Sequence, residues 1–311
     1  MNAAIKVRGL TKTYPGKPPV HAVRGIDFDV AAGQCFGVLG PNGAGKTTTI
    51  EILEGLLPAS GGDAEILGMK WATQAQQIRA RIGVSLQETR LNERLTVLET
   101  IQLFRSFYSR GLTPMEALEL VSLTDKAKSW VKNLSGGQKQ RLAVATALVG
   151  QPDLIFLDEP TTGLDPSSRR QMWEIIENLI AAGKTILLTT HYMEEAERLC
   201  DRVAIFDQGT IIAEGSPSQL IQSLGADHVI EFSLETNANR FDAQQFATLP
   251  TVGRIEADNG QIRITAGQPH LVLPLLLGRL KESNYHLASL TTRHASLEDV
   301  FVTLTGRHLD D

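Results

Sequence analysis

The sequence predicts an α/β protein, with a doubly wound parallel β-sheet in a large first domain and a small α+β domain after it. Two observations carry this prediction. Apolar runs of strand length alternate with stretches of helix formers between residues 26 and 191, and this alternation is typical of helices packed on both faces of a parallel sheet. One run, residues 153–157, is apolar enough for a strand that is buried on both faces.

The elements of the first domain follow in order along the chain. Residues 26–30 alternate apolar and acidic side chains, which predicts a half-buried strand among several short strands near the N-terminus. Helix formers dominate residues 91–127, where Gly111 and Pro114 are expected to separate the helices. The other expected strands are 34–39, 81–86, 153–157 and 185–189, and the other expected helices are 46–57, 135–148 and 166–181.

The character of the sequence changes around residues 223–227, which predicts a first domain at 1–224 and a second at 227–311. Strand and helix patterns in the second domain follow the order βαββαβ, that of a small ferredoxin-like sandwich, with a turn at Asn259-Gly260. Its expected strands are 228–234, 252–257, 261–265 and 285–291, and its expected helices lie near 241–247, at 269–281 and from Ser296 onward.

Composition limits the possible partners. The formal net charge of −5 shows no basic bias, which speaks against a nucleic-acid partner. Cys35 and Cys200 are far apart in the sequence and form no CxxC pair, so neither a disulfide framework nor a zinc site is expected. Residues 1–14 lack the apolar centre of a signal peptide. The most apolar stretch, residues 271–277, contains Pro274 and is far shorter than the roughly 20 residues that span a bilayer.

A glycine-rich loop at residues 40–47 fits the pattern GxxxxGK[ST], which binds phosphate groups. Its glycines allow backbone angles that turn successive N–H groups toward a phosphate, and the helix that starts near Lys46 adds the positive end of its dipole. Lys46 is expected to reach the β- and γ-phosphates of a nucleotide, and the Thr47 hydroxyl to bind Mg²⁺. The candidate nucleotide-binding residues here are Gly40, Pro41, Asn42, Gly43, Ala44, Gly45, Lys46, Thr47 and Thr48.

Two acidic residues directly follow the apolar run at 153–157. The C-terminal ends of strands in an open α/β sheet face the ligand crevice, so Asp158 is expected beside the phosphate loop as a partner of Mg²⁺. Glu159 is then placed to take a proton from a water that attacks the γ-phosphate. Without the phosphate loop, the pair would indicate no more than a strand that ends in a polar turn.

The order of the motifs resembles that of the ABC ATPases. Residues 134–138, Leu-Ser-Gly-Gly-Gln, are similar to the signature motif of that family, and they are the most specific feature of the chain. The resemblance covers residues 5–224 and implies a P-loop NTPase core that hydrolyses ATP, with an N-terminal antiparallel β subdomain and a helical subdomain at about 91–132 that docks on a membrane partner. The motifs stand in the family's order: the phosphate loop, Gln87, the signature, residues 157–160, residues 163–165 and His191.

The resemblance also implies roles for single residues. Tyr14 resembles the aromatic residue that stacks on adenine. Gln87 resembles the residue that senses Mg²⁺ and the attacking water, and His191 resembles the switch that contacts the γ-phosphate. Asp165 resembles the residue that links the two active sites of a dimer. The nucleotide contacts implied for the signature are Ser135, Gly136, Gly137 and Gln138.

The signature is the reason for expecting two copies. Ser135 is expected to cap a helix whose first N–H groups form an anion site, while Lys46 already holds the chain's own γ-phosphate. In the resembled family the signature completes the partner's site. A homodimer that encloses ATP is therefore expected, with a pair of related half-transporters as the open alternative.

The end of the chain carries a second resemblance. Residues 296–306 are similar to the closing segment of a branch with multidrug, daunorubicin-type and nodulation-factor exporters, although an amphipathic helix capped by Ser296 explains the same pattern. Together the resemblances imply an ATP-hydrolysing subunit on the cytoplasmic face of the cell membrane. Through a separate permease it would drive export of a drug, a lipid or another small molecule, and the cargo stays open.

Two other functions fit a chain with these motifs. An ABC ATPase that acts on ribosomes usually carries two cassettes, and one that acts on DNA has a long coiled coil between the loop and the signature. Here the gap from residue 47 to residue 134 is short and has no heptads. The other alternative is a regulatory module without catalysis. The presence of Lys46, Asp158, Glu159 and His191 argues against it.

Overall fold

The computed structural model describes residues 3–87, 89–225, 227–235, 242–258 and 260–306. The chain divides into two compact units, Met1–Gly215 and Ser216–Asp311. Among the described residues, no helix combines the length and the apolar character needed to cross a membrane.

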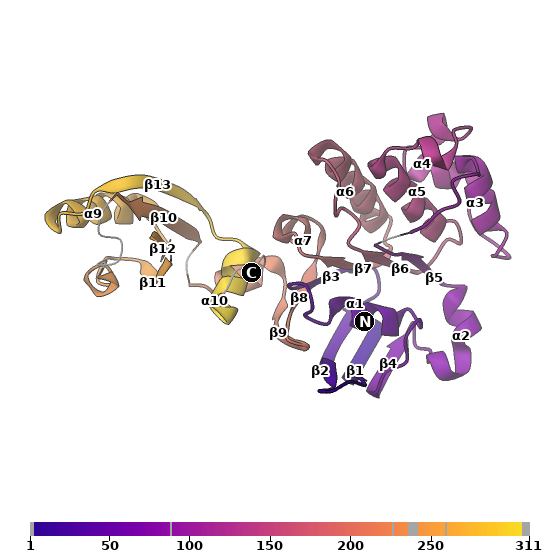
Figure 1. Ribbon diagram of the computed structural model, residues 1–311, viewed down its shortest axis with the longest axis horizontal. Helices are drawn as coiled ribbons and strands as arrows, with labels where there is room; N and C mark the ends of the chain where they lie inside the picture. Colours follow the sequence, from indigo (N-terminus) through magenta and orange to yellow (C-terminus); the bar gives the residue numbers. More distant parts are fainter. Residues whose placement is uncertain (1–2, 88, 226, 236–241, 259, 307–311) are drawn as a thin grey trace. The chain divides into compact units, whose positions relative to one another are not determined.

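A six-stranded sheet forms the centre of the first unit (Figure 1). Five neighbouring strands are parallel, and β9 at one edge is antiparallel to β8. Every residue of β3, β6 and β7 is buried, as expected where both faces of a parallel sheet are covered. This confirms the predicted doubly wound sheet. Across the sheet the strands are β5 (Ile82–Ser85), β6 (Leu154–Asp158), β7 (Thr185–Thr190), β3 (Cys35–Leu39), β8 (Arg202–Asp207) and β9 (Thr210–Gly215).

Helices lie on both faces of the central sheet. Figure 1 shows α5 and α6 on one face, and α1 on the other between the central sheet and a smaller sheet. The helix α1 begins at Lys46 as predicted, but it ends at Leu53 instead of residue 57. Gly55 follows with a left-handed φ of 75°, a frequent helix terminator. The helices around the sheet are α1 (Lys46–Leu53), α5 (Gly136–Leu148), α6 (Pro166–Ala181) and α7 (Met193–Leu199).

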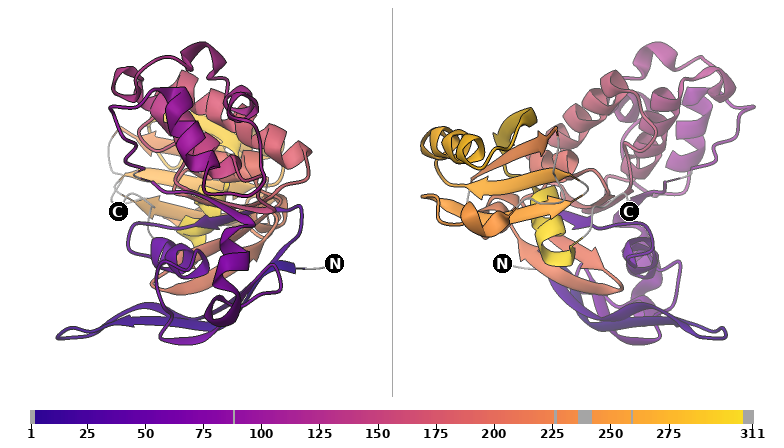
Figure 2. Two further views of the ribbon diagram at one scale, coloured as in Figure 1. Left: turned by 90° about the vertical axis from the view of Figure 1, so that its right-hand side faces the viewer. Right: turned by 60° about the vertical axis from the view of Figure 1, so that its left-hand side comes forward.

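The smaller sheet has three antiparallel strands in the order β2-β1-β4. The sequence predicted short strands here, which is wrong: β1 (Ala3–Tyr14) and β2 (Val20–Ala31) have 12 residues each and form the long indigo hairpin of Figure 2. Several register shifts interrupt their pairing, and such bulges break the strict alternation by which a long strand is recognised in a sequence. Phe28 of β2 stacks on Phe36 of the central sheet at 5.4 Å, so the two sheets share one core.

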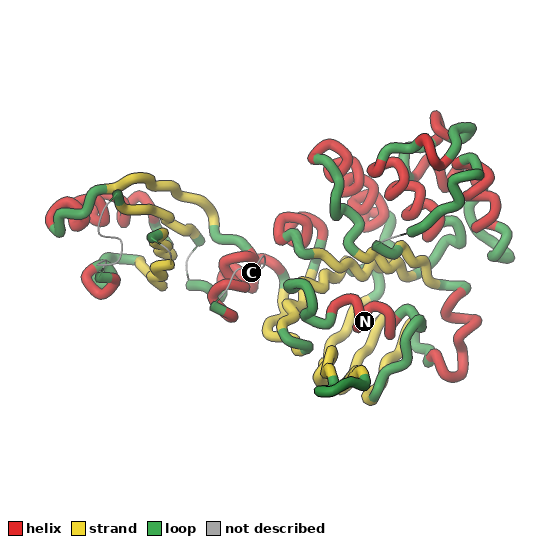
Figure 3. Tube along the Cα trace, in the orientation of Figure 1, coloured by secondary structure: helices red, strands yellow, loops and turns green. Residues whose placement is uncertain are grey.

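Short helices fill the segment between β5 and α5 (Figure 3). Thr96 and Thr113 each begin a helix with a capping box, and Pro114 occupies the first turn of the second one. The predicted break near Gly111 and Pro114 is therefore confirmed. These elements are α3 (Val97–Arg105), α4 (Pro114–Leu120), η1 (Thr124–Lys126) and η2 (Val131–Asn133), and the sequence did not predict β4 (Gly61–Ile66) or α2 (Trp71–Arg79).

The second unit contains a four-stranded antiparallel sheet in the order β11-β12-β10-β13. This is the strand order of the predicted βαββαβ sandwich. The prediction of its first helix was wrong, because the described residues near 241–247 form only a short 3₁₀ helix, η4 (Ala243–Gln245). Asn259 of the predicted turn lies outside the described residues. The other elements are α8 (Pro217–Gln222), β10 (His228–Leu234), β11 (Val252–Asp258), β12 (Gln261–Ala266), α9 (Pro269–Glu282), β13 (Leu287–His294) and α10 (Leu297–Thr305).

The start of the second unit is set by a short helix. The helix α8 contacts α10, and both lie within Ser216–Asp311. The division between the units therefore precedes α8, whereas the sequence predicted a boundary between residues 224 and 227, after this helix.

Candidate active site

The phosphate loop connects β3 to α1 and depends on three glycines with positive φ: Gly40 at 149°, Gly43 at 79° and Gly45 at 98°. A Cβ atom at Gly40 would lie 2.3 Å from the Phe206 carbonyl oxygen, and one at Gly45 would lie 2.4 Å from that of Ala22. These two positions accept no side chain. At Gly43 a Cβ atom would meet nothing within 4 Å, so the backbone there is open to a ligand.

The first turn of α1 keeps its N–H groups free of side-chain caps. Its N-cap residue, Gly45, supplies no side-chain acceptor, and the first turn carries no acidic residue. The four orphan N–H groups at a helix N-terminus, together with the helix dipole, attract an anion. The loop and the helix therefore fit a phosphate group.

Lys46 is held deep in the same loop. The side chain is only 5% exposed, and Nζ donates hydrogen bonds to the carbonyl oxygens of Gly40 at 2.7 Å and Pro41 at 3.1 Å. Burial lowers the pKa of Lys46, while the nearby charges of Glu159 and Asp158 raise it. A buried ammonium close to two carboxylates is suited to binding the negative charge of a polyphosphate.

Three segments, which follow β5, β6 and β7, meet at the Glu159 carboxylate. Its Oε2 accepts hydrogen bonds from Gln87 Nε2 at 3.1 Å and Thr162 Oγ1 at 3.0 Å, and it lies 3.4 Å from His191 Nδ1. The backbone N–H of Glu159 donates to Thr189 Oγ1 at 2.9 Å. Glu159 has a φ of 45°, a left-handed conformation that a non-glycine residue keeps only where its surroundings enforce it.

Asp158 ends β6 and lies next to Glu159 in the chain. It is 6% exposed, and its Oδ1 accepts a hydrogen bond from Thr189 Oγ1. Burial raises the pKa of Asp158, and the Thr189 hydroxyl and Lys46 act in the opposite direction. The oxygen-bearing side chains of Thr47, Gln87 and Asp158 are the hard ligands that Mg²⁺ prefers, so these residues fit the ion that the motif implies.

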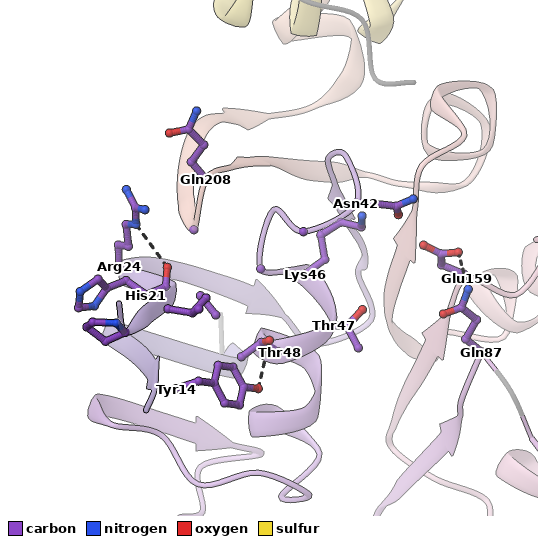
Figure 4. A pocket seen from close by; sticks show the side chains of 16 residues that line it. Tyr14, His21, Arg24, Asn42, Lys46, Thr47, Thr48, Gln87, Glu159 and Gln208 are labelled. Carbon is purple, nitrogen blue, oxygen red and sulfur yellow. Dashed lines mark hydrogen bonds between the residues drawn. The ribbon is translucent and has the colours of Figure 1, made fainter. Parts of the chain in front are cut away.

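A cavity of about 680 Å³ is lined by Lys46 and Glu159 among others, whereas Asp158 and His191 are not among its lining residues (Figure 4). Figure 4 shows Tyr14 and Thr48 on one side of Lys46 and Gln87 with Glu159 on the other. The Tyr14 hydroxyl lies 3.4 Å from Thr48 Oγ1. The predicted site residues that line the cavity are Tyr14, Asn42, Gly43, Gly45, Lys46, Thr47, Thr48, Gln87 and Glu159.

Part of the cavity wall was missed by sequence reasoning. It comes from the start of β2 and from the turn between β8 and β9, which the Arg24 N–H to Gly209 O hydrogen bond joins at 2.8 Å. Val20 pairs with Tyr14 across the β1–β2 hairpin, so knowledge of that hairpin would have placed this strand beside the predicted aromatic residue. The missed residues are Pro19, Val20, His21, Ala22, Arg24, Gln208 and Gly209.

The signature motif lies apart from this cavity. Ser135 is the N-cap of α5, with Oγ accepting from the Gln138 N–H at 3.3 Å and its own N–H donating to Gln138 Oε1 at 3.0 Å. The predicted helix start is therefore confirmed. Among the predicted nucleotide contacts, those that do not line the cavity are Gly40, Pro41, Ala44, Ser135, Gly136, Gly137, Gln138 and Asp165.

Asp165 closes the N-terminus of α6 in a similar way. Its carboxylate accepts from the N–H groups of Ser167 and Ser168 and from Ser168 Oγ at 2.6 Å. The Ser168 hydroxyl is the largest cause that lowers the pKa of Asp165. A Cβ atom at Gly137 would lie 2.5 Å from the same hydroxyl oxygen, so α5 and α6 meet closely at their N-terminal ends.

Comparisons with known proteins agree on similarity to ATP-binding proteins of ABC transporters. The sequence profile of the ABC transporter family matches residues 23–162. The "Nod factor export ATP-binding protein I" of Cupriavidus pinatubonensis is 40% identical over 100% of this chain and 93% of that protein. The protein of the same name from Rhizobium meliloti is 41% identical over 99% of this chain and 90% of that protein.

A solved structure supports the same fold. It is the dimeric structure of a post-hydrolysis state of an ATP-binding cassette bound to ADP and Pi. The two chains have a TM-score of 0.63 and 28% sequence identity, and the match covers 68% of this chain and 98% of that one.

Proposed function

The chain belongs to the ATP-binding proteins of the ABC transporter family and is an ABC-type ATPase, and from this membership we propose that it drives export through a separate membrane permease. The similarity to Nod factor export proteins extends over the whole chain, including the second unit. That observation favours a lipo-oligosaccharide of the Nod factor type as cargo over a drug. We place the protein on the cytoplasmic face of the membrane, held there by the permease.

Hydrolysis is assigned to the residues around the cavity. The loop N–H groups and Lys46 bind the phosphates, and Tyr14 stacks on the adenine. Thr47, Gln87 and Asp158 would hold Mg²⁺, which would neutralise charge that develops on the phosphates. Glu159 takes a proton from the attacking water, and its hydrogen bonds with Gln87 and Thr162 fix the carboxylate for that step. His191, 3.4 Å from Glu159, contacts the γ-phosphate side of the site.

A second copy of the chain completes each site in this proposal. The signature residues cap their own helix and line no part of the cavity that contains Lys46. A partner's signature would supply the missing anion contacts from Ser135, Gly136 and Gly137. The dimeric cassette structure with 28% identity supports this arrangement.

The cargo is tested by transport. The chain is co-expressed with its permease, and uptake of a radiolabelled lipo-oligosaccharide and of daunorubicin is measured in inside-out vesicles with ATP. We expect ATP-dependent uptake of the lipo-oligosaccharide, and loss of this uptake in Glu159→Gln. Uptake of the drug alone would contradict the cargo assignment, and uptake that persists at the parental rate in Glu159→Gln would contradict the role of Glu159.

A further inference from the structure

A buried carboxylate on α7 is not part of the cavity. Glu195 is 0% exposed, and its Oε1 accepts hydrogen bonds from Thr161 Oγ1 at 2.8 Å and Trp173 Nε1 at 2.9 Å. Thr161 is also 0% exposed. Burying a carboxylate is costly, and burial raises the pKa of Glu195, while the side chains of Thr190, Thr161 and Trp173 and the nearby charge of Arg169 act in the opposite direction. The position therefore calls for an explanation beyond packing.

One partner of Glu195 lies in the turn that follows Glu159. Thr161 is two residues after Glu159, and Thr162 donates to Glu159 Oε2. The turn is closed by backbone hydrogen bonds from Thr162 N to Glu159 O at 3.2 Å and from Leu164 N to Thr161 O at 3.2 Å. In these contacts, the Thr161 hydroxyl ties the turn to α7, and the next residue holds the Glu159 carboxylate.

The same helix begins at the segment that carries His191. Tyr192 is the N-cap residue of α7, and its N–H donates to Thr190 Oγ1 at 2.9 Å. The Tyr192 ring lies 4.1 Å from the His191 ring and 4.3 Å from the guanidinium carbon of Arg169. Glu195, in the first turn of α7, thus joins two of the segments that meet at Glu159 Oε2, those that carry Thr162 and His191.

We propose that Glu195 is a positioning residue for ATP hydrolysis: through Thr161 it fixes the turn after Glu159 and keeps the Glu159 carboxylate oriented toward the attacking water. The proposal rests on Glu159 being the general base. The left-handed φ of 45° at Glu159 needs such an enforcing neighbour. The hydrogen bond from Trp173 to the same oxygen has a different role: Trp173 lies on α6, so this bond holds α7 against that helix.

The test compares variants that keep or remove one hydrogen bond. Thr161→Val keeps the shape of the side chain and removes the hydroxyl, whereas Thr161→Ser keeps the hydroxyl. Glu195→Leu removes the acceptor, whereas Glu195→Gln keeps Oε1 as an acceptor. The readouts are the kcat and KM for ATP of the purified full-length chain with Mg²⁺, binding of a fluorescent ATP analogue, and the Tm of each variant.

We expect Thr161→Val and Glu195→Leu to lower kcat by about tenfold to a hundredfold, because a small misplacement of a catalytic group costs about that much. The KM for ATP and analogue binding should stay within about twofold, since the phosphate loop is untouched. Thr161→Ser and Glu195→Gln should restore kcat to within about threefold of the parent. If Glu195→Leu does not fold, the Thr161 pair decides the question.

A double variant separates positioning from a general loss of structure. Single-turnover hydrolysis of radiolabelled ATP is measured for Glu159→Gln with and without Thr161→Val. We expect Thr161→Val to change the rate of Glu159→Gln by less than about twofold, because the group that it positions is already gone.

Three outcomes would overturn the proposal. Thr161→Val could lower the rate by the same factor in both backgrounds, which indicates a structural role alone. It could also leave kcat at the parental value while Glu159→Gln is slow, which removes the positioning role and leaves the proposed function intact. If Glu159→Gln itself hydrolyses ATP at the parental rate, the general-base assignment fails and the positioning role fails with it.

Discussion

The N-termini of α1 and α5 are both suited to an anion, and they differ in what closes them. At α1 the N-cap is Gly45, no side chain caps the helix, and the first residues line the cavity. At α5 the N-cap is Ser135, whose hydroxyl and backbone are closed by Gln138 in a capping box, and no residue of this turn lines the cavity. The N-terminus of α1 is therefore open to a ligand in the cavity of its own chain, whereas the N-terminus of α5 is not part of that cavity.

This difference suggests that the α1 side and the α5 side of one chain have separate roles. The α1 side contains the lysine, the backbone N–H groups and the carboxylate that we propose bind and cleave a nucleotide. On the α5 side, Ser135 and Asp165 cap two helices that meet at Gly137 and Ser168. A helix N-terminus that lines no part of its own chain's cavity suits the role that we propose for it in the site of a second copy.

The largest expected effect separates binding from chemistry on the α1 side. Glu159→Gln should lower kcat by about 10²- to 10⁴-fold, the usual cost of losing a general base, and still bind ATP. Lys46→Ala should weaken nucleotide binding itself, because it removes the buried charge beside the loop. Steady-state ATPase assays and titration with a fluorescent ATP analogue check both. Equal loss of ATP binding in the two variants would contradict the assignment.

The C-terminal ends of α1 and α5 also differ. The cap residue of α5 is the apolar Val149, whereas that of α1 is Glu54, which is 4% exposed and has no hydrogen-bond partner for either carboxylate oxygen among the described residues. Burial, with smaller contributions from Asp158 and Glu51, raises the pKa of Glu54 to about 8.

This pKa predicts how stability depends on pH. The folded value lies above the value of 4.5 for a free Glu, so the neutral carboxyl favours the folded state at low pH, and this contribution is lost as the pH rises through about 8. Between pH 6 and pH 8 the loss should be about 2 kcal/mol, at about 1.4 kcal/mol per unit. Glu54→Gln should remove this dependence in thermal unfolding without nucleotide, and Glu119→Gln, an exposed control, should keep it. Parallel curves for Glu54→Gln and the parent would show that the group is not buried neutral.

On the α5 side, substitutions at two neighbouring glycines should have a smaller effect, on the free energy of unfolding. A Cβ atom at Gly137 would lie 2.5 Å from Ser168 Oγ, whereas one at Gly136 would meet nothing within 4 Å. Gly137→Ala should lower the free energy of unfolding by about 1–3 kcal/mol through overpacking. Gly136→Ala should be neutral or slightly stabilising, by at most about 1 kcal/mol, because alanine favours a helix. Chemical denaturation compares the two, and equal effects would mean that α5 and α6 do not meet closely at Gly137.

The smallest effect concerns the second unit. Both helix N-termini and every residue that lines the cavity belong to Met1–Gly215. A chain that ends after Gly215 should therefore fold and bind ATP with an affinity within about threefold of the parent, less than 1 kcal/mol. Isothermal titration calorimetry checks this, with circular dichroism to verify folding. Loss of nucleotide binding in a folded truncation would place part of the site in the second unit.

The sequence predicted the parts of this molecule that depend on local chemistry. The glycines of the loop, the helix start at Ser135 and the strand that leads into Asp158 each follow from a short pattern of residues. The wall formed by His21 and Arg24 could not be predicted, since it depends on how a bulged hairpin pairs.

The contacts of Glu195 were also out of reach for sequence analysis. Its position in a short charged helix resembles an ordinary solvated face, and its burial depends on how α6 and α7 pack. The same holds for Thr162, whose hydroxyl contacts Glu159 only because the turn after β6 folds back on itself.

Mixing two inactive variants tests the central claim, that α1 of one copy and α5 of another make one site. Lys46→Ala removes the lysine that we propose binds the phosphates, and Ser135→Arg fills the proposed anion site at the signature. Each variant alone should therefore be nearly inactive. In a mixture, random pairing gives heterodimers with one intact composite site, and the account predicts recovery of up to about a quarter of the parental ATPase rate. A mixture that is no more active than the sum of its two folded components would contradict it.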